Sequence, residues 1–268
     1  MSVQLTPDRP LLPPHRAAAP APLLVTARRR QGAARDTALH RHPRGQLLGT
    51  LGGLLTVTTA TGTMVLPPVS ALWLPPGAPH AARSHGPFDG WSVYVAPAAY
   101  GDLPATPRVV GMSGLLREAV LRACSWPPDG TALTPAQERL AGDILDEIAG
   151  PPDDAFTLPL PTDPRLARVA QALAADPADD RPMTALSAAA WVAPRTLSRR
   201  FPQQTGLTFA AWRQRARLLR ALELLAAGTP VTTVAFDLGY DSVSSFIRAF
   251  RLTFGSTPGR YFDGAGGQ

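Results

Sequence analysis

One face of a predicted helix near the C-terminus carries hydroxyl and guanidinium groups at helical spacing. Ser244 is followed by Arg248 and Arg251, with Val243 beside them. An arginine can donate two hydrogen bonds to a guanine in the major groove, and hydroxyl and guanidinium groups also bind phosphate oxygens. The residue types and their spacing therefore predict a helix that reads duplex DNA.

The surrounding segment predicts the scaffold that would present these groups. Val231–Leu238 has a helical period, Gly239 allows the chain to reverse at a positive φ, and Ser242 is a candidate N-cap. The opposite face of the following helix carries an aromatic residue at every fourth position: Phe246, Phe250 and Phe254. This pattern is typical of a helix-turn-helix, whose buried face packs on its partner helix while the polar face enters the groove.

A second pattern of the same kind lies upstream. A helical stretch, Thr184–Ala190, is followed by the break Trp191–Pro194 and by a helix whose inward side chains are Leu197 and Phe201. The outward face of this helix offers Arg195, Ser198 and Arg199. A long predicted helix, Phe209–Ala227, joins the two patterns. Two such units can place reading helices in successive major grooves, about 34 Å apart.

These segments resemble the AraC/XylS family of bacterial transcription regulators. The resemblance covers Arg195–Gly206, Ala216–Gly228 and VAFDLGYDSVSSFIRAFRLTFGSTPGRYF, residues 234–262. It implies a tandem helix-turn-helix domain that binds DNA. The matching positions for base reading are Arg195, Ser198, Arg199, Val243, Ser244 and Arg248. Those better placed for phosphates are Arg200, Arg217, Arg251 and Arg260.

The first unit departs from the family pattern at three positions. Trp191 stands in the turn where glycine or a small residue is usual. Ala193 replaces a Ser or Thr N-cap, a loss of about 1 kcal/mol. Pro202 falls late in the first reading helix, where it removes a backbone donor and crowds the carbonyl of Ser198. We therefore expect the second reading helix to contribute more to sequence specificity.

The region from Pro22 to Pro97 has a different character. Short apolar and β-branched runs alternate with Gly and Pro signals: PLLVTARR, GQLLGTLGG, LLTVTTATG, TMVLPP, SALWLPPG and GWSVYVAP. Many short strands at close spacing favour a β-sandwich or barrel. From Met112 the period becomes helical, with amphipathic stretches at Ser113–Ala123 and Thr134–Ala149. These patterns predict an α+β multidomain fold class: an N-terminal jelly-roll-like β-barrel followed by an all-α tandem helix-turn-helix domain.

This region also resembles cupins and an AraC subgroup with a cupin sensor. His40, His42 and Gln46 match the first cupin motif, and LPPGAPH, ending at His80, resembles the second. His40 and His42 would share one face of a strand, and His80 would meet them from a neighbouring strand. Three imidazoles and an amide oxygen suit Zn, Ni or Fe(II). A barrel that only hydrogen-bonds its histidines or holds an organic ligand is the alternative, while His15 and His85 are expected to be solvated.

Composition sets further bounds. Every basic side chain is arginine, and the net charge is +6. From Asp163 onward there are 13 Arg and 8 acidic residues, against 13 and 12 before it. No apolar run is long enough to span a bilayer, and the lone Cys124 fits a reducing cytoplasm. We expect a disordered leader, a sensor, a helical dimerisation segment with a proline-rich linker, the DNA-binding domain and a flexible tail: residues 1–20, 21–105, 106–160, 161–263 and 264–268.

Two function classes fit these features. The first is a transcription regulator, activator or repressor, that binds duplex DNA as a homodimer, responds to a small molecule or metal and contacts RNA polymerase. Its target would be a neighbouring transporter or efflux gene, an expectation from the subgroup resemblance. The second is a metal-dependent cupin dioxygenase or isomerase with an attached DNA-binding module. The nearby carboxylates, Asp36 and Asp89, are expected in loops, so no catalytic acid or base is evident and regulation is favoured.

Overall fold

The computed structural model describes residues 23–99, 101–126 and 132–263. The predicted leader, His15 and the predicted tail lie outside these residues. The chain divides into two compact units. The first takes in the described residues up to Thr59 and Met64–Phe156, and the second takes in Ala60–Thr63 and the described residues from Thr157. No described helix is long and apolar enough to cross a membrane.

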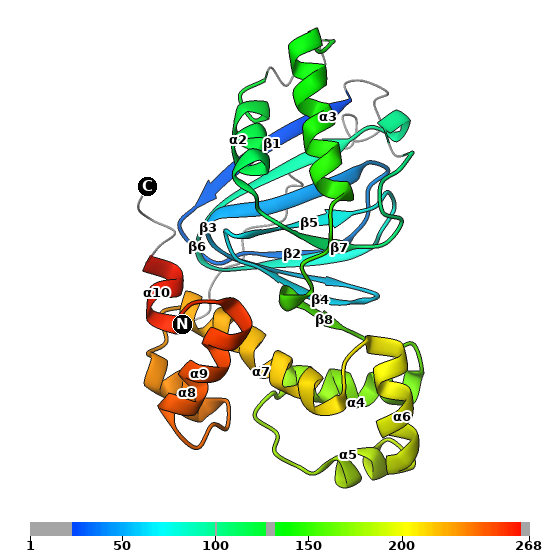
Figure 1. The fold of residues 1–268 in the computed structure, drawn as a ribbon, viewed down its shortest axis with the longest axis vertical. Helices are drawn as coiled ribbons and strands as arrows, with labels where there is room; N and C mark the ends of the chain where they lie inside the picture. The colour runs from blue at the N-terminus through cyan, green and yellow to red at the C-terminus, as the bar shows by residue number, and fades with distance from the viewer. Residues whose placement is uncertain (1–22, 100, 127–131, 264–268) are drawn as a thin grey trace. The chain divides into compact units, whose positions relative to one another are not determined.

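The first unit is built on an antiparallel β-sheet (Figure 1). Its central strands, β3 (Gly45–Thr59) and β6 (His80–Val95), pair along most of their length. Strands β1 (Leu24–Gln31) and β2 (Asp36–His40) pair with β6. Strands β4 (Gly62–Leu66) and β5 (Ser70–Leu74) pair with β3, and β7 (Arg108–Gly111) pairs with β5. The predicted N-terminal β domain is confirmed.

Strand β3 corrects one sequence-based expectation. The runs GQLLGTLGG and LLTVTT were expected to be two strands separated by glycines, but they form one continuous strand. The pairing register with β6 shifts between Thr50 and Gly52 and again between Gly52 and Leu54. Gly53 has φ 82°, and a Cβ there would lie 2.2 Å from the Pro87 carbonyl oxygen. These glycines therefore allow bulges within a strand instead of ending it.

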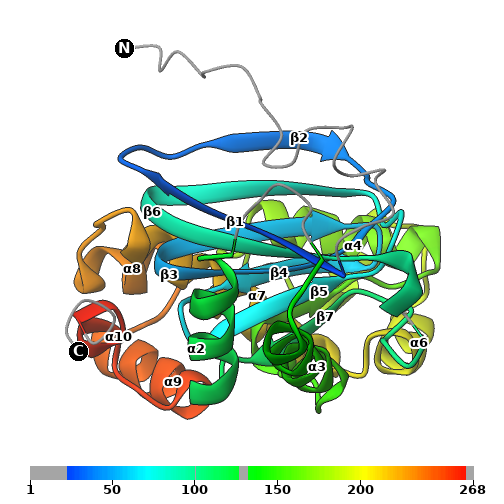
Figure 2. The same ribbon diagram turned by 90° about the horizontal axis from the view of Figure 1, so that it is seen from above.

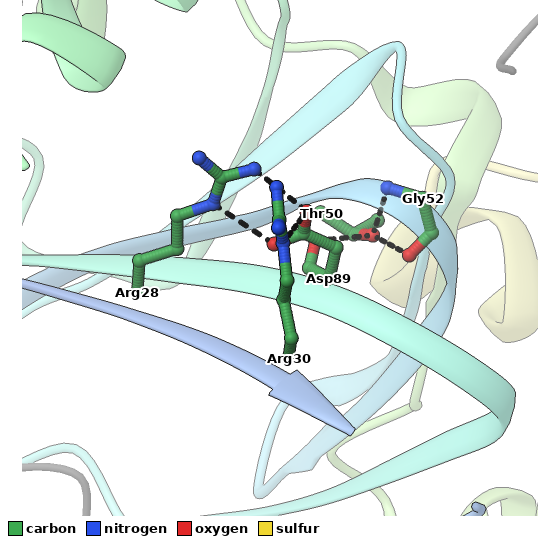
Figure 3. A network of polar contacts seen from close by, with 5 residues as sticks. All are labelled: Arg28, Arg30, Thr50, Gly52 and Asp89. Atoms are coloured by element: carbon green, nitrogen blue, oxygen red, sulfur yellow. Dashed lines mark hydrogen bonds and ion pairs between the residues drawn. The ribbon is translucent and has the colours of Figure 1, made fainter. Parts of the chain in front are cut away.

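A polar network crosses the bulged part of the sheet (Figure 3). Arg28 on β1 donates from Nε and Nη2 to the two carboxylate oxygens of Asp89, at 3.0 and 2.7 Å. Arg30 Nε donates to Asp89 Oδ2 at 2.9 Å. The Thr50 hydroxyl accepts from the Gly52 N–H at 3.0 Å and lies 3.2 Å from the Asp89 carbonyl oxygen. The network thus joins β1 and β6 to the bulge in β3.

This network predicts a pH dependence of stability. The hydrogen bond from Arg28 lowers the pKa of Asp89, with Arg30 adding to the effect. A lowered folded-state pKa means that the contribution is fully present above the unfolded pKa of about 3.9 and is lost as the pH falls through the folded value. Because the ion pair is partly exposed, we expect less than about 1 kcal/mol. Urea unfolding at pH 7 and pH 3 should show a smaller pH effect for Asp89→Asn than for wild type.

A matched control is Asp36→Asn. Asp36 forms an ion pair as well, with Arg83 at 3.2 Å, but its side chain is 46% exposed, against 22% for Asp89. The control should keep most of the wild-type difference between the two pH values. Equal behaviour of the two variants would contradict the role given to the Asp89 network.

Two helices complete the first unit. α2 (Gly114–Ala123) is capped by Ser113, and α3 (Pro135–Ala149) by Thr134 in a capping box with Gln137. Figure 2 shows both helices on the same side of the sheet. Their apolar side chains form one core with the strands, through residues that include Leu116, Val120, Ile144, Leu47, Trp73 and Val93. Both helices lie in residues 106–160, which were expected to form a helical linker or dimerisation segment and a proline-rich linker, and their apolar faces cover the sheet.

The second unit is helical. After the short strand β8 (Thr157–Pro159) it contains seven described helices: α4 (Pro164–Ala175), α5 (Met183–Ala189), α6 (Pro194–Thr205), α7 (Phe209–Ala226), α8 (Val231–Asp237), α9 (Val243–Phe254) and α10 (Pro258–Asp263). In Figure 1, α7 runs between the group α4–α6 and the group α8–α10. The predicted tandem arrangement and its joining helix are confirmed.

Each helical group has an aromatic core of its own. Phe201 packs edge-on against Phe209 and Trp212, and the Trp212 indole donates to the Pro159 carbonyl at 2.7 Å. In the other group, Phe246 and Phe250 are fully buried, with ring centroids 5.8 Å apart. Helix α6 continues through Pro202 to a left-handed Gly206, so the proline lies in the last turn without ending the helix.

Candidate nucleic-acid interface and effector site

Helix α9 presents the predicted polar face. The Ser242 side chain accepts a hydrogen bond from the Ser245 N–H and caps the helix at its start. Phe246 and Phe250 hold the opposite face in the core. The residues predicted to contact DNA lie on this face: Ser244, Arg248 and Arg251 are exposed and Val243 is half-buried. Among the described residues neither arginine has an ion-pair partner, so both guanidinium groups are available to a ligand.

Helix α6 presents the corresponding side chains of the first unit. Leu197 and Phe201 are fully buried. Four predicted contact residues are exposed: Arg195, Ser198, Arg199 and Arg200. Arg200 lies 3.4 Å from the carboxylate of Asp163, the residue that caps α4. Arg199 has no such acidic neighbour among the described residues, which makes it the better candidate for a base contact.

Two arginines of α7, Arg213 and Arg217, donate hydrogen bonds to backbone carbonyls of the same unit. Arg217, expected to bind phosphate, donates from Nε to the Pro177 carbonyl at 2.9 Å. Arg213 donates to the carbonyl oxygens of Asp179 and Arg181. These bonds hold the loop between α4 and α5 against α7. The sequence pattern did not reveal this, because the loop carbonyls are brought to α7 only by the tertiary fold.

The predicted irregularities in the first unit are observed. Trp191 has φ 56°, the left-handed region that favours glycine. Ala193 occupies the N-cap position of α6 and makes no side-chain capping bond. Both differ from the second unit, where Gly239 and Ser242 fill the turn and cap positions.

A cluster of three histidines forms in the first unit. His40, at the end of β2, pairs in register with His80, at the start of β6. His42 lies beyond the end of β2, so the expectation that it shares a strand face with His40 is wrong; Pro43 follows it and restricts its backbone. The loop nevertheless brings it close, and one ring nitrogen from each histidine lies within 4.8 Å of the others.

The three imidazoles are oriented in the same way. His40 Nδ1 lies 2.9 Å from the Ala38 carbonyl, His42 Nδ1 2.6 Å from that of Arg44, and His80 Nδ1 2.9 Å from that of Ala78. A carbonyl accepts only from a protonated ring nitrogen, so in neutral His40 and His80 the proton is on Nδ1, and their Nε2 atoms carry lone pairs that can accept a hydrogen bond or bind a metal ion. In His42 both ring nitrogens face oxygen atoms, because Nε2 also lies beside the Gln46 side chain.

Gln46 extends the cluster into the sheet interior. Its Oε1 lies 2.9 Å from His42 Nε2, and its Nε2 lies 2.9 Å from Ser92 Oγ and 3.3 Å from Tyr94 Oη. Gln46, Ser92 and Tyr94 are all buried. Sequence reasoning missed Ser92 and Tyr94, although their spacing of two in GWSVYV indicates a shared strand face.

Burial favours the neutral forms of His42 and His80. Burial lowers the pKa of His80 to about 4 and also lowers the pKa of His42. Burial raises the pKa of Tyr94 to about 12, so its hydroxyl stays protonated. No described Asp or Glu joins the histidine cluster. A cation bound there would meet ligands without formal charge.

The remaining polar residues of this unit correct other expectations. His85 lies on β6, half-buried, with its Nε2 2.9 Å from the Thr56 hydroxyl, and is therefore not a solvated loop residue. Asp36 begins β2 and Asp89 lies on β6, so neither is in a loop. Both carboxylates face arginines, which leaves neither poised as a catalytic base.

The two units match two protein families. Residues 23–157 match the AraC-like ligand binding domain, and residues 186–264 match a helix-turn-helix domain. A ligand-binding β domain joined to a DNA-binding helix-turn-helix domain defines a transcription regulator. The chain belongs to the AraC family.

Individual relatives agree with this assignment. The chain is 31% identical to the HTH-type transcriptional regulator NimR of Escherichia coli over 223 residues, which is 83% of this chain and 81% of that protein. It is 40% identical to RipA of Corynebacterium glutamicum over 113 residues, 42% of this chain and 34% of RipA. These relatives are transcription regulators, which sets the cupin-enzyme alternative aside.

The chain also resembles solved structures, with TM-scores of 0.40 or less. The DNA-binding domain of AdpA in complex with a target DNA is 30% identical, with a TM-score of 0.36, over 38% of this chain and 93% of that one. ToxT from Vibrio cholerae is 9% identical, with a TM-score of 0.40, over 92% of this chain and all of that one.

Proposed function

We propose that the chain is a bacterial, cytoplasmic regulator whose affinity for its operator is set by an effector bound at His40, His42, His80 and Gln46. The effector changes transcription only through its different affinities for the DNA-competent and incompetent states. DNA is read by α6 and α9. Arg199 and Arg248 each donate two hydrogen bonds to a guanine, while Arg200 and Arg251 bind phosphates.

The observation that carries the effector site is the shared orientation of the three imidazoles. Each Nδ1 faces a backbone carbonyl, and this arrangement is typical of histidines that coordinate metal through Nε2. The depressed pKa values of His42 and His80 keep the lone pairs available near neutral pH. The donor set fits a divalent transition metal such as Zn, Ni or Fe(II), with Gln46 as a weaker oxygen ligand. When bound, such an ion supplies positive charge and joins β2, the following loop and β6.

A small organic effector is the second candidate. The buried hydroxyls of Ser92 and Tyr94 and the Gln46 amide offer both donors and acceptors beside the histidines. Such convergent polar groups in an apolar interior are typical of small-molecule sites. Metal-free protein whose operator affinity still responds to an organic compound would favour this candidate.

The wider role follows from the family resemblance. We propose that the chain acts as a homodimer, contacts RNA polymerase and controls a neighbouring, divergently transcribed transporter gene. A mobility-shift assay with the gene's own upstream intergenic DNA tests this target. Binding no tighter than to scrambled DNA of equal length would contradict it.

The metal proposal predicts a complete loss in one variant. His42→Ala removes one of three nitrogen ligands, so we expect bound metal to fall from about one per chain to near zero. Elemental analysis of purified protein after incubation with Zn or Ni measures this directly. The effect of metal on the mobility shift should disappear in the same variant.

His85→Ala is the matched control. It removes a half-buried histidine from the same sheet, but one that bonds Thr56 and lies outside the cluster. Its metal content should equal that of wild type. Unchanged metal in His42→Ala would show that the three histidines do not hold the ion.

A further inference from the structure

The turn before α6 contains an exposed tryptophan, Trp191, in a backbone conformation that favours glycine. The Trp191 N–H donates to the Ala188 carbonyl at 3.0 Å, and the Val192 N–H to that of Ser187 at 2.9 Å. The second helix-turn-helix makes the same pair of bonds, from Gly239 to Phe236 and from Tyr240 to Ala235, both at 3.0 Å. The φ values are 56° for Trp191 and 73° for Gly239. The two turns therefore have one backbone design, which glycine satisfies without strain and tryptophan does not.

The side chain does not compensate for this strain within the unit. Trp191 is 85% exposed, whereas its neighbour Val192 is 6% exposed and belongs to the core. No ring contact or hydrogen bond of the Trp191 side chain is found in the described part of the chain. The left-handed backbone at Trp191 costs stability, and the exposed indole adds no burial that would offset this cost. A contact with a molecule outside the folded unit would account for the tryptophan.

The surroundings indicate what would cover the indole. The segment 183–205 contains Arg195, Arg199 and Arg200 and no Asp or Glu. Trp191 lies four residues before Arg195, the first exposed arginine of α6. Because Ala193 makes no capping bond, the first turn of α6 also lacks the side-chain acceptor that Ser242 supplies to α9. Positive charge and uncapped N–H groups fit a polyanion.

We infer that Trp191 is a DNA-contacting residue that packs its indole on the sugar–phosphate backbone beside the bases read by α6. An indole offers a flat apolar face to deoxyribose, and its Nε1–H donates to a phosphate oxygen. The contact positions α6 on the DNA without reading the base sequence. It also helps to hold the start of α6, where Ala193 makes no side-chain capping bond. This inference rests on the DNA-binding function of the helix-turn-helix domain.

Trp191→Gly should change DNA affinity and folding stability in opposite directions, so the two effects can be told apart. The variant should melt roughly 2–4 °C higher, because it relieves the left-handed strain, as expected for a stabilised domain of this size. Its affinity for a duplex that wild-type protein selects from random-sequence DNA should fall about tenfold, the usual scale for truncating an interface tryptophan. Trp191→Phe should keep most of the affinity, and the salt dependence of binding should change little, unlike that of Arg200→Ala.

Leu39→Ala is the control, since it removes a 72% exposed apolar side chain from the other unit. It should leave DNA binding unchanged. Wild-type affinity in Trp191→Gly together with a higher melting temperature would overturn the inference. Unchanged DNA affinity with altered transcription would assign Trp191 to a protein partner and would overturn it equally. Failure of wild-type protein to select any duplex would instead contradict the DNA-binding function.

Discussion

Arg248→Ala is expected to weaken specific operator binding by roughly 5–150-fold, with much less effect on the affinity for unrelated DNA. The Arg248 side chain is exposed on a helix that is fixed by the Ser242 cap and by buried Phe246 and Phe250. A guanidinium that donates two hydrogen bonds to guanine is worth about 1–3 kcal/mol of discrimination, or roughly 5–150-fold. Mobility shifts with the selected duplex and with a scrambled duplex measure this loss.

Arg199→Ala provides the comparison within the same domain. Arg199 is also exposed, on α6, but that helix starts without a side-chain cap and after a strained turn. We therefore expect a smaller loss of specificity than for Arg248→Ala. Both substitutions are on the surface and should leave the melting temperature almost unchanged. A larger loss in Arg199→Ala would reject the ranking of the two reading helices.

Gly45→Ala is expected to destabilise the first unit more than other small changes on the same strand. A Cβ at residue 45 would lie 2.1 Å from Cη2 of Trp73. That ring cannot move freely, because it is fully buried and its Nε1 donates to the Pro104 carbonyl at 2.8 Å. Overpacking of this kind costs about 1–3 kcal/mol and lowers the melting temperature by roughly 2–4 °C for each kcal/mol.

Gly52→Ala is the matched control on β3, since nothing lies within 4 Å of its added Cβ. It should melt close to wild type. Gly45 also precedes Gln46, so Gly45→Ala should weaken effector binding as well as stability. Equal melting temperatures of the two alanine variants would show that the Trp73 ring moves aside at little cost, and would contradict this prediction.

The second helix-turn-helix could be read from the sequence because its signals are local. The period of Val234, Ala235 and Leu238, the positive φ of Gly239 and the Ser242 cap all act within one or two turns of the chain. The same holds for α3, where Thr134 and Pro135 define the start. Local rules also indicated the strain at Trp191, since its backbone conformation follows from its place in the turn.

The histidine cluster was predicted only in part. His40 and His80 meet because β2 and β6 pair, which the motif resemblance implied. The position of His42 outside the strand, and the carbonyl partners of all three Nδ1 atoms, depend on the loop geometry. Ser92 and Tyr94 reach Gln46 from a strand far along the chain.

The sequence by itself determined the class of protein, the helices of the DNA-binding unit and the exposed arginines of α6 and α9, because capping, turn geometry and helical period depend on near neighbours. Only the tertiary structure decided that α2 and α3 complete the sheet core, that the glycines of β3 form bulges, and that Asp89 joins Arg28 and Arg30. Those features arise from pairing between distant strands and from burial of apolar faces. Chain-local patterns do not specify such partners, so they emerge only when the sheet assembles.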